Sequence, residues 1–479
     1  MKLKFLQITF LLLSNSMFVL DSFAKKENSQ KTVKDLRPVK LNLELMEKIK
    51  KRGGFLISDK IGDYILRAES LSENKKYDEA IDFLKYHYDR ADRLSQIERA
   101  DLAFHLATTY KLKGNNRKAL EFLQKALDFE VLAYNKHLSL LFLLAEIYID
   151  ENKIRKGESV LMEWFSINEN PHLPAYVLLA YIYYNRNQLN QALKYVEYVL
   201  SLSLKPKENW LNFVISIYVK KNKYKKAQPY LEKLVALFPQ KANHWRQLVG
   251  IYLHLNDYKK AFITLEMAYK MGHLNKETEF FNLASLYVDQ GLPYQSARFL
   301  EEKINTKQVP FKKKYLEFLA EVFYQAREGD KALEYFKKAS KLAKDSNFFI
   351  RYGQRLLQEE KWKEAEEVLK KILTFKDIKE TIESIEKYKK LLAQQKKDFE
   401  ANFHTISEEE EKLKAPFSNQ LENVYLNLGI ALYNQKDYAS ALTYFKKAIE
   451  VDDTFLNAYQ WIDSTELVLQ ELKQTRLSY

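Results

Sequence analysis

The chain has 479 residues, a formal net charge of +13 and no cysteine. Without cysteine, disulfides, thiolate catalysis and thiolate metal sites are excluded. Glycine (11) and proline (9) are scarce, while Tyr (32) and Phe (29) are abundant, so the composition favours long helices joined by aromatic packing. Lys and Glu alternate along the chain instead of forming one basic stripe, and we therefore expect no nucleic-acid partner.

The N-terminus has the pattern of a secretory signal peptide. Lys2 and Lys4 precede the apolar run Phe5–Leu20, and Ser22 and Ala24 are small residues at the −3 and −1 positions of a cleavage site. We predict a signal peptide over residues 1–24, cleavage after Ala24, and a periplasmic mature protein without a transmembrane helix. The alternative is an uncleaved anchor, but the run is shorter than a membrane-spanning helix requires and polar residues interrupt it.

Helical repeats are predicted along most of the mature chain. Residues 25–60 predict a flexible, Lys-rich lead-in followed by a short N-terminal capping helix within residues 41–57. From residue 61 to 376, a small residue, an aromatic residue and two further small residues recur at starts about 33–39 residues apart, which predicts about nine helix pairs. The clearest copy contains Trp245, Leu248, Tyr252, Ala261 and Ala268.

These positions resemble the tetratricopeptide repeat (TPR) pattern W-x₂-L-x₃-Y…A…A. The resemblance implies an all-α fold, a TPR α-solenoid in which about ten helix-turn-helix repeats coil into a right-handed superhelix with an open groove. Small residues are expected where the two helices of a pair cross closely.

One segment interrupts the repeats. Residues 377–418 are highly charged, with one long helix expected over 377–403, an acidic run Glu408–Glu411 and the breaker Ala415-Pro416. This insertion is either a degenerate repeat with a solvated charged face or a docking element or hinge. Residues 419–479 then predict a final repeat and a C-terminal capping helix over 454–475.

The sequence contains no recognised catalytic motif. None of the eight His residues forms a HExxH pair, and phosphate-loop, GxSxG and dinucleotide-binding patterns are absent. We therefore expect a non-enzymatic protein without cofactor or metal, although an enzyme or small-ligand-binding protein that uses the groove is an alternative function from another class.

The groove of the solenoid is the candidate functional surface. In TPR proteins the first helix of each pair lines it at the second, fifth, ninth, twelfth and thirteenth positions, and this register predicts a peptide-binding surface. The alternative is that these aromatic residues only fill the inner wall. A carboxylate clamp for a peptide C-terminus is not expected, because Lys111 and Lys220 are isolated. The candidate residues are Phe104, Thr108, Phe142, Glu146, Tyr181, Tyr184, Asn212, Arg246, Phe281 and Tyr324.

The stretch Trp245–Glu301 has a more specific resemblance. Ala268-Tyr269, Gly272, Leu283-Ala284 and Pro293-Tyr294 match a run found in secreted TPR proteins encoded beside TonB components in proteobacteria. The resemblance implies a periplasmic scaffold, an accessory of a TonB–ExbB–ExbD outer-membrane transport system, with proteins or peptides as partners. An envelope-assembly or secretion adaptor with other clients is the alternative within the same class.

Overall fold

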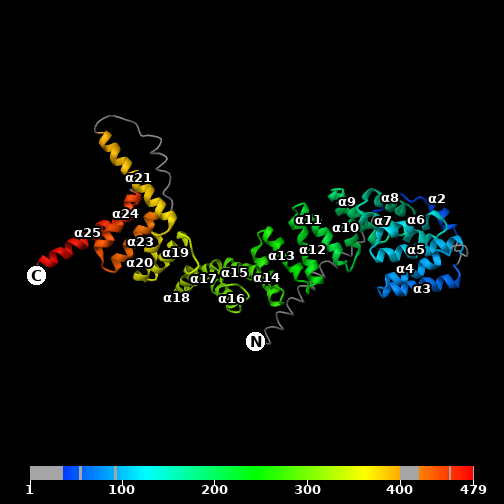
Figure 1. The fold of residues 1–479 in the computed structure, drawn as a ribbon, viewed down its shortest axis with the longest axis horizontal. Helices are drawn as coiled ribbons and strands as arrows, with labels where there is room; N and C mark the ends of the chain where they lie inside the picture. The colour runs from blue at the N-terminus through cyan, green and yellow to red at the C-terminus, as the bar shows by residue number, and fades with distance from the viewer. Residues whose placement is uncertain (1–35, 53–56, 91–93, 400–419, 453–454, 478–479) are drawn as a thin grey trace, which may run out of the picture. The chain divides into compact units, whose positions relative to one another are not determined.

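The computed structural model describes residues 36–52, 57–90, 94–399, 420–452 and 455–477, and over these residues every regular element is a helix (Figure 1). The signal peptide predicted over 1–24 and the acidic run Glu408–Glu411 lie outside the described residues. The chain divides into two compact units, residues 1–257 and residues 258–479. Each unit consists of helices that pack as successive pairs in chain order, which is the all-α arrangement of helix pairs predicted from the sequence.

The first unit contains the helices from α2 to the first helix of the sixth repeat. They are α2 (Leu43–Lys50), α3 (Asp59–Glu73), α4 (Tyr77–Tyr88), α5 (Gln96–Leu112), α6 (Asn116–Asp128), α7 (Tyr134–Asp150), α8 (Ile154–Ile167), α9 (Leu173–Asn185), α10 (Leu189–Leu202), α11 (Glu208–Lys220), α12 (Tyr224–Leu237) and α13 (Ala242–His254).

The second unit contains the remaining helices. They are α14 (Tyr258–Lys270), α15 (Glu277–Asp289), α16 (Pro293–Asn305), α17 (Lys313–Gln325), α18 (Gly329–Ser340), α19 (Ser346–Gln358), α20 (Trp362–Ile372), α21 (Lys376–Phe399), α23 (Leu421–Asn434), α24 (Tyr438–Val451) and α25 (Leu456–Leu477).

The same turn ends the first helix of successive pairs. At each turn one residue has a positive φ, for example Asn187 (58°) and Asn222 (54°), and the next amide donates to a carbonyl five residues earlier, as Lys223 N does to Tyr218 O at 2.9 Å. This is the 6→1 hydrogen bond of a Schellman motif, which satisfies a carbonyl that the helix end leaves open. Asn occupies this position in several repeats because it tolerates the left-handed region better than most residues.

Small residues lie where the paired helices cross. Ala145, Ala180 and Ala284 are fully buried. A Cβ added to Gly353 would lie 2.6 Å from Leu369 Cδ2, and one added to Gly429 would lie closer still to Phe445 Cε1. Both distances are too short for a side chain larger than that of glycine. The fixed spacing of small residues in the sequence therefore reflects close helix crossings.

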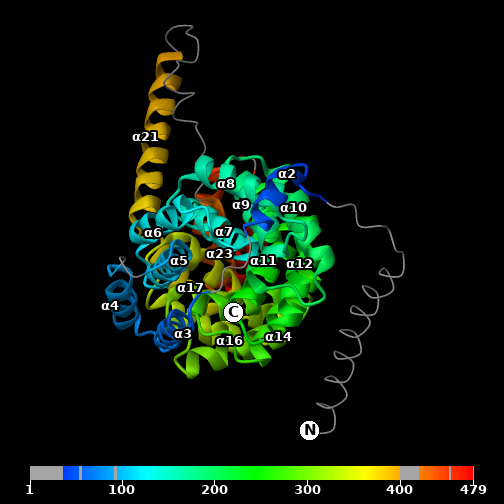
Figure 2. The same ribbon diagram turned by 90° about the vertical axis from the view of Figure 1, so that its right-hand side faces the viewer.

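The last repeat packs directly on the ninth, although the insertion separates them in sequence. Helix α23 lies against α20, and Gln435 Nε2 donates to Glu366 Oε2 at 2.8 Å. Helix α21, the long helix expected over 377–403, is anchored at its start by the buried Ile378 and by Ser346 Oγ, which donates to Asp377 Oδ2 at 2.5 Å. The middle of α21 is held by the buried Ile385 and by Lys389, which pairs with Glu450 of α24 at 2.6 Å, and only its last part extends away from the other helices (orange in Figures 1 and 2).

The N-terminal helix α2 does not lie where a cap of the first repeat would. It packs against α8 of the third repeat, with Met46 and Ile49 buried (Figure 1). Asn42 N donates to Ser166 O at 2.7 Å, and Arg37 donates to the carbonyls of Asn168 and Glu169 at 3.0 and 2.9 Å. We refer to residues 36–52 as the N-terminal strap. At the other end of the chain, α25 covers α24, and Trp461 stacks on Phe445.

Candidate functional site

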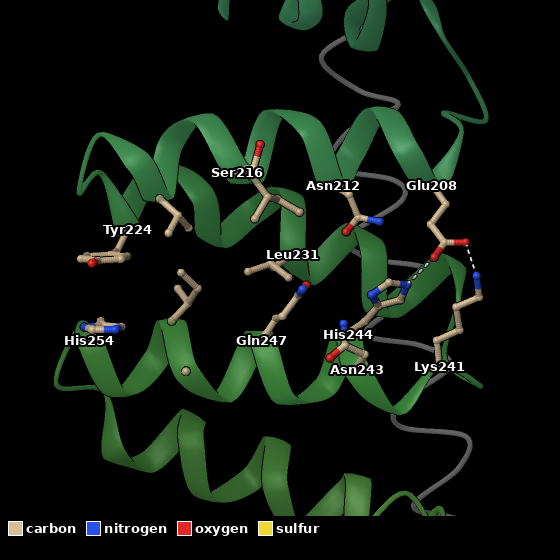
Figure 3. Close-up of a pocket in the computed structure, with 14 residues that line it drawn as sticks. Glu208, Asn212, Ser216, Tyr224, Leu231, Lys241, Asn243, His244, Gln247 and His254 are labelled. Atoms are coloured by element: carbon tan, nitrogen blue, oxygen red, sulfur yellow. Dashed lines mark hydrogen bonds and ion pairs between the residues drawn. The ribbon is translucent and has the colours of Figure 1, made fainter. Parts of the chain in front are cut away.

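A hollow of about 610 Å³ opens between α11 and α13, the first helices of the fifth and sixth repeats (Figure 3). Its floor is apolar and comes from the buried side chains of Ile215, Leu231 and Ile251. All lining residues belong to the first unit. They are Glu208, Asn212, Ile215, Ser216, Val219, Tyr224, Leu231, Lys241, Asn243, His244, Gln247, Gly250, Ile251 and His254.

Uncharged polar side chains form the walls of the hollow. Asn212 projects from α11 toward α13, and Asn243 and Gln247 lie on α13 across from it (Figure 3). Ser216 also borders the hollow, but its hydroxyl donates to Phe213 O at 2.7 Å within α11. A side-chain amide carries both donors and an acceptor. The walls therefore present the two kinds of hydrogen-bonding group that an extended polypeptide backbone needs.

At one end of the hollow, the negative charge of Glu208 is balanced by the positive charge of Lys241. Glu208 accepts from Lys241 Nζ, and Glu208 Oε1 lies 3.0 Å from His244 Nε2. The hydrogen bond from Lys241 is the largest cause that holds the pKa of Glu208 below its usual value. With Glu208 ionised, Nε2 carries the imidazole proton, so in the neutral ring Nδ1 is an acceptor. His244 is 3% exposed, and within the described part of the chain its Nδ1 has no hydrogen-bond partner.

The other end of the hollow is aromatic. The rings of Tyr224 and His254 stack face to face, with centroids 4.4 Å apart and planes within 2° (Figure 3). Because both rings border the hollow and lie edge-on to it (Figure 3), a ligand that fills the hollow contacts the edges of the stacked rings at this end and the Glu208 cluster at the other.

An aromatic cluster lies on α9 and α11 beside the hollow. Phe213 packs edge-on against Tyr184 at 5.6 Å and contacts Tyr181 at 6.1 Å. The Lys220 ammonium lies 4.6 Å from the centre of the Tyr184 ring. Tyr181 is 42% exposed, so this cluster offers an apolar surface next to the polar walls.

The structure brings three of the predicted groove residues into this region. Asn212 lines the hollow, and Tyr181 and Tyr184 form the neighbouring aromatic cluster. Arg246 lies on α13 but does not line the hollow.

The other predicted groove residues in the first unit lie on α5 and α7. Phe142 packs between Trp164 and His172. Glu146 is half-buried, and burial raises its pKa. Phe104 lies against the ring of His105, and the Thr108 hydroxyl donates to Phe104 O within the same helix. None of these four residues lines the hollow.

Phe281 and Tyr324 belong to the second unit. Phe281 packs against Tyr315 and Phe318, and the guanidinium of Arg355 lies 3.8 Å from the centre of the Tyr324 ring. Arg355 in turn pairs with Glu321 of α17. Neither predicted residue lines the hollow, and both are engaged within their own unit.

Sequence reasoning missed most of the lining residues, although the register contained some of them. With Trp245 at the fourth position of its repeat, the second, ninth and thirteenth positions are Asn243, Gly250 and His254, and all three line the hollow. Tyr224 and Gln247 lie outside the register rule and needed the structure.

Family comparison identifies the repeats. Models of the tetratricopeptide repeat match residues 100–130, 173–206, 215–272 and 423–455. The chain is a tetratricopeptide repeat protein. One matched segment, 215–272, includes every residue that lines the hollow except Glu208 and Asn212. None of these matching models describes a catalytic family. A search of curated proteins finds no match.

Solved TPR structures show similarity at low sequence identity. A TPR protein from Cytophaga hutchinsonii is 14% identical over 58% of this chain and 95% of its own, with a TM-score of 0.36. One from Parabacteroides merdae is 15% identical over 51% and 93%, with a TM-score of 0.33. YrrB, described as a TPR protein with an unusual peptide-binding site, is 19% identical over 45% and 97%, with a TM-score of 0.31.

Two further properties concern the described residues only. Among them, no three His, Asp or Glu side chains are grouped so that they could hold a metal ion. None of the helices there combines the length and apolarity needed to cross a membrane. TPR domains bind proteins or peptides.

Proposed function

We propose that this TPR protein is a non-catalytic scaffold that binds an extended polypeptide segment in the hollow between α11 and α13. The observation that carries the proposal is the position of Asn212 on α11 opposite Asn243 and Gln247 on α13, across an apolar floor. An extended segment has free backbone donors and acceptors along its length, and side-chain amides can satisfy both.

The charges at the hollow favour such a ligand over a strongly charged one. Glu208 is compensated by Lys241 and by the hydrogen bond with His244. The remaining wall residues are neutral amides and a hydroxyl. An uncharged peptide segment therefore loses little on desolvation and gains backbone hydrogen bonds.

A random dodecapeptide library displayed on phage tests this proposal on the full chain. We expect the peptides that are selected to bind the Asn212→Ala and Gln247→Ala variants at least tenfold more weakly. Asn135→Ala is the matched control, because Asn135 is an exposed amide on α7 outside the hollow, and its binding should equal that of the wild type. Selected peptides that bind all three variants equally would place the binding site elsewhere and refute the proposal.

We also propose where the scaffold acts. The Lys2–Ala24 segment has the signal-peptide pattern described above, and the Trp245–Glu301 run resembles secreted TPR proteins associated with TonB. These two features support a periplasmic accessory of a TonB–ExbB–ExbD transport system, with cleavage after Ala24.

Fractionation and crosslinking test the location and the partner separately. The mature N-terminus should begin at Lys25 in the periplasmic fraction, as read by N-terminal sequencing. Crosslinked envelopes should yield TonB, ExbB or ExbD with the scaffold. If a periplasmic protein crosslinks only to outer-membrane assembly or secretion factors, the envelope-adaptor alternative replaces the TonB role.

A further inference from the structure

We infer that the hollow is a subsite for one large apolar side chain of the bound polypeptide, and that Gly250 is the residue that keeps it open. The inference rests on the proposed function, because it assigns the chemistry of the segment that the hollow receives. It is carried by three features: a glycine that packing does not require, the loss of side-chain bulk along one row of positions, and the apolar floor.

Gly250 lies in the interior of α13, where glycine disfavours the helix relative to alanine. Three other helical glycines have a packing reason, since a Cβ at Gly157, Gly353 or Gly429 would overlap a neighbouring side chain. Gly62 of α3, like Gly250, lacks such a reason, but it does not border the hollow. A Cβ at Gly250 would meet no atom within 4 Å, and its φ is not positive. Neither packing nor backbone conformation therefore requires a glycine at this position, and the space in front of it is part of the hollow.

The neighbouring repeats show what a side chain would do at this position. Gly250 is the ninth residue of its repeat, and the ninth residues of the two preceding repeats are Tyr181 and Ser216. Tyr181 is 42% exposed and packs with Phe213, so it occupies the groove surface of its own repeat. From the fourth to the sixth repeat, the ninth position therefore changes from tyrosine to serine to glycine. The hollow lies where this position has the smallest side chains.

The chemistry of this space suits an apolar, aromatic-sized group. The floor residues Ile215, Leu231 and Ile251 are at most 6% exposed, and a hollow of about 610 Å³ has room for a side chain as large as Trp together with the backbone on either side of it. The stacked rings of Tyr224 and His254 present their edges at one end (Figure 3), which favours edge-to-face contacts with a ligand ring. The amides on the walls remain free to hold the backbone on either side of that anchor.

The test uses the peptides selected on the wild-type chain. We expect them to share one Trp, Phe, Tyr or Leu, and replacement of that residue by Ala should weaken binding at least tenfold. Gly250→Leu should weaken binding of the original peptides at least tenfold because the leucine side chain occupies the subsite. Gly62→Leu is the matched control, since Gly62 is a helical glycine of α3 in the same unit whose Cβ would also meet nothing within 4 Å.

The remaining outcomes separate this inference from the proposed function. If Gly250→Leu binds as the wild type does while Asn212→Ala still loses binding, the anchor subsite is wrong and the peptide site stands. If no selected peptide depends on Asn212 or Gln247, both fail. Should Gly250→Leu melt below the wild type, Val219→Trp adds bulk to the hollow from α11, and wild-type affinity in that variant would overturn the inference.

Discussion

The hydroxyl of Tyr252 on α13 donates a hydrogen bond of 2.7 Å to Oε1 of Glu232 on α12. The same relationship recurs one repeat earlier and one repeat later, since Tyr218 donates to Glu197 and Tyr287 donates to Glu266. In each case the tyrosine of a first helix is tied to the second helix of the preceding repeat. Burial, reinforced by the carboxylate, raises the pKa of Tyr252.

Removing this hydroxyl should weaken the joint between the fifth and sixth repeats. Tyr252 is 5% exposed, so Tyr252→Phe leaves Glu232 with one donor fewer in a half-buried place. We expect a loss of about 1–2 kcal/mol in the free energy of unfolding, measured by urea denaturation. The exposed Tyr294 is the control, because Tyr294→Phe should change the free energy of unfolding by less than about 0.5 kcal/mol. Equal effects of the two substitutions would contradict a role for the hydrogen bond.

Two glycine-to-alanine substitutions should change stability in opposite directions. Gly62→Ala fills open space on α3 and should stabilise the protein by about 0.5–1 kcal/mol through higher helix propensity. Gly429→Ala places a methyl group against the Phe445 ring and should destabilise it by about 1–3 kcal/mol through overpacking. Thermal unfolding of the two variants checks the signs. The buried Ala261 should behave like Gly429 when a larger residue replaces it.

His137 should make the first unit sensitive to mild acid. It is 7% exposed, and burial, followed by the nearby Arg52, lowers its pKa to about 4, with Glu130 opposing. The pKa of His137 is lower in the folded than in the unfolded protein, so burial of the neutral imidazole contributes to the free energy of unfolding. This contribution is complete above the unfolded pKa of about 6.5 and is lost as the pH falls towards 4. At pH 5 this loss is about 2 kcal/mol.

Urea unfolding at pH 7.5 and pH 5 measures that loss. His137→Leu should reduce the difference between the two pH values by about 2 kcal/mol. If the wild type and the variant lose the same free energy between pH 7.5 and 5, His137 does not carry this sensitivity.

Asp101 and Lys136 form an ion pair, and substitution of the lysine should lower the free energy of unfolding. Asp101 is 1% exposed, and both of its carboxylate oxygens accept from Lys136 Nζ at 2.5 Å, joining α5 to α7. Lys136→Met should cost about 3–5 kcal/mol because it leaves a buried carboxylate without its cation. The double variant Asp101→Leu with Lys136→Met should recover most of that loss. A double variant no more stable than Lys136→Met would show that packing, and not the stranded charge, sets the cost.

The helix pairs could be predicted from the sequence because their determinants are local. The spacing of Ala and Gly at crossings, the tyrosine beside them and the turn residue at each helix end repeat with one period, and each residue acts within its own pair or on the next. The position of α2 could not be predicted in this way. Its buried residues Met46 and Ile49 indicate an amphipathic helix, but nothing local indicates that it packs on α8.

The hollow could be predicted only in part for a related reason. Asn212 follows from the register rule, whereas Tyr224 and Gln247 line the hollow because of the particular way in which α11, α12 and α13 pack. Phe142, by contrast, satisfies the register rule but packs against Trp164 and His172. An aromatic residue at a groove position can serve either purpose, and its neighbours on adjacent helices decide which.

The N-terminal strap has a consequence for the order in which the first unit folds. Arg37 bonds to a carbonyl 131 residues further along the chain, so the strap has no binding surface until α8 has formed. Until then Met46 and Ile49 remain exposed on a short helix that is marginal by itself. Repeats one to three can form by local contacts, whereas docking of the strap waits for that long loop to close and completes this part of the protein last.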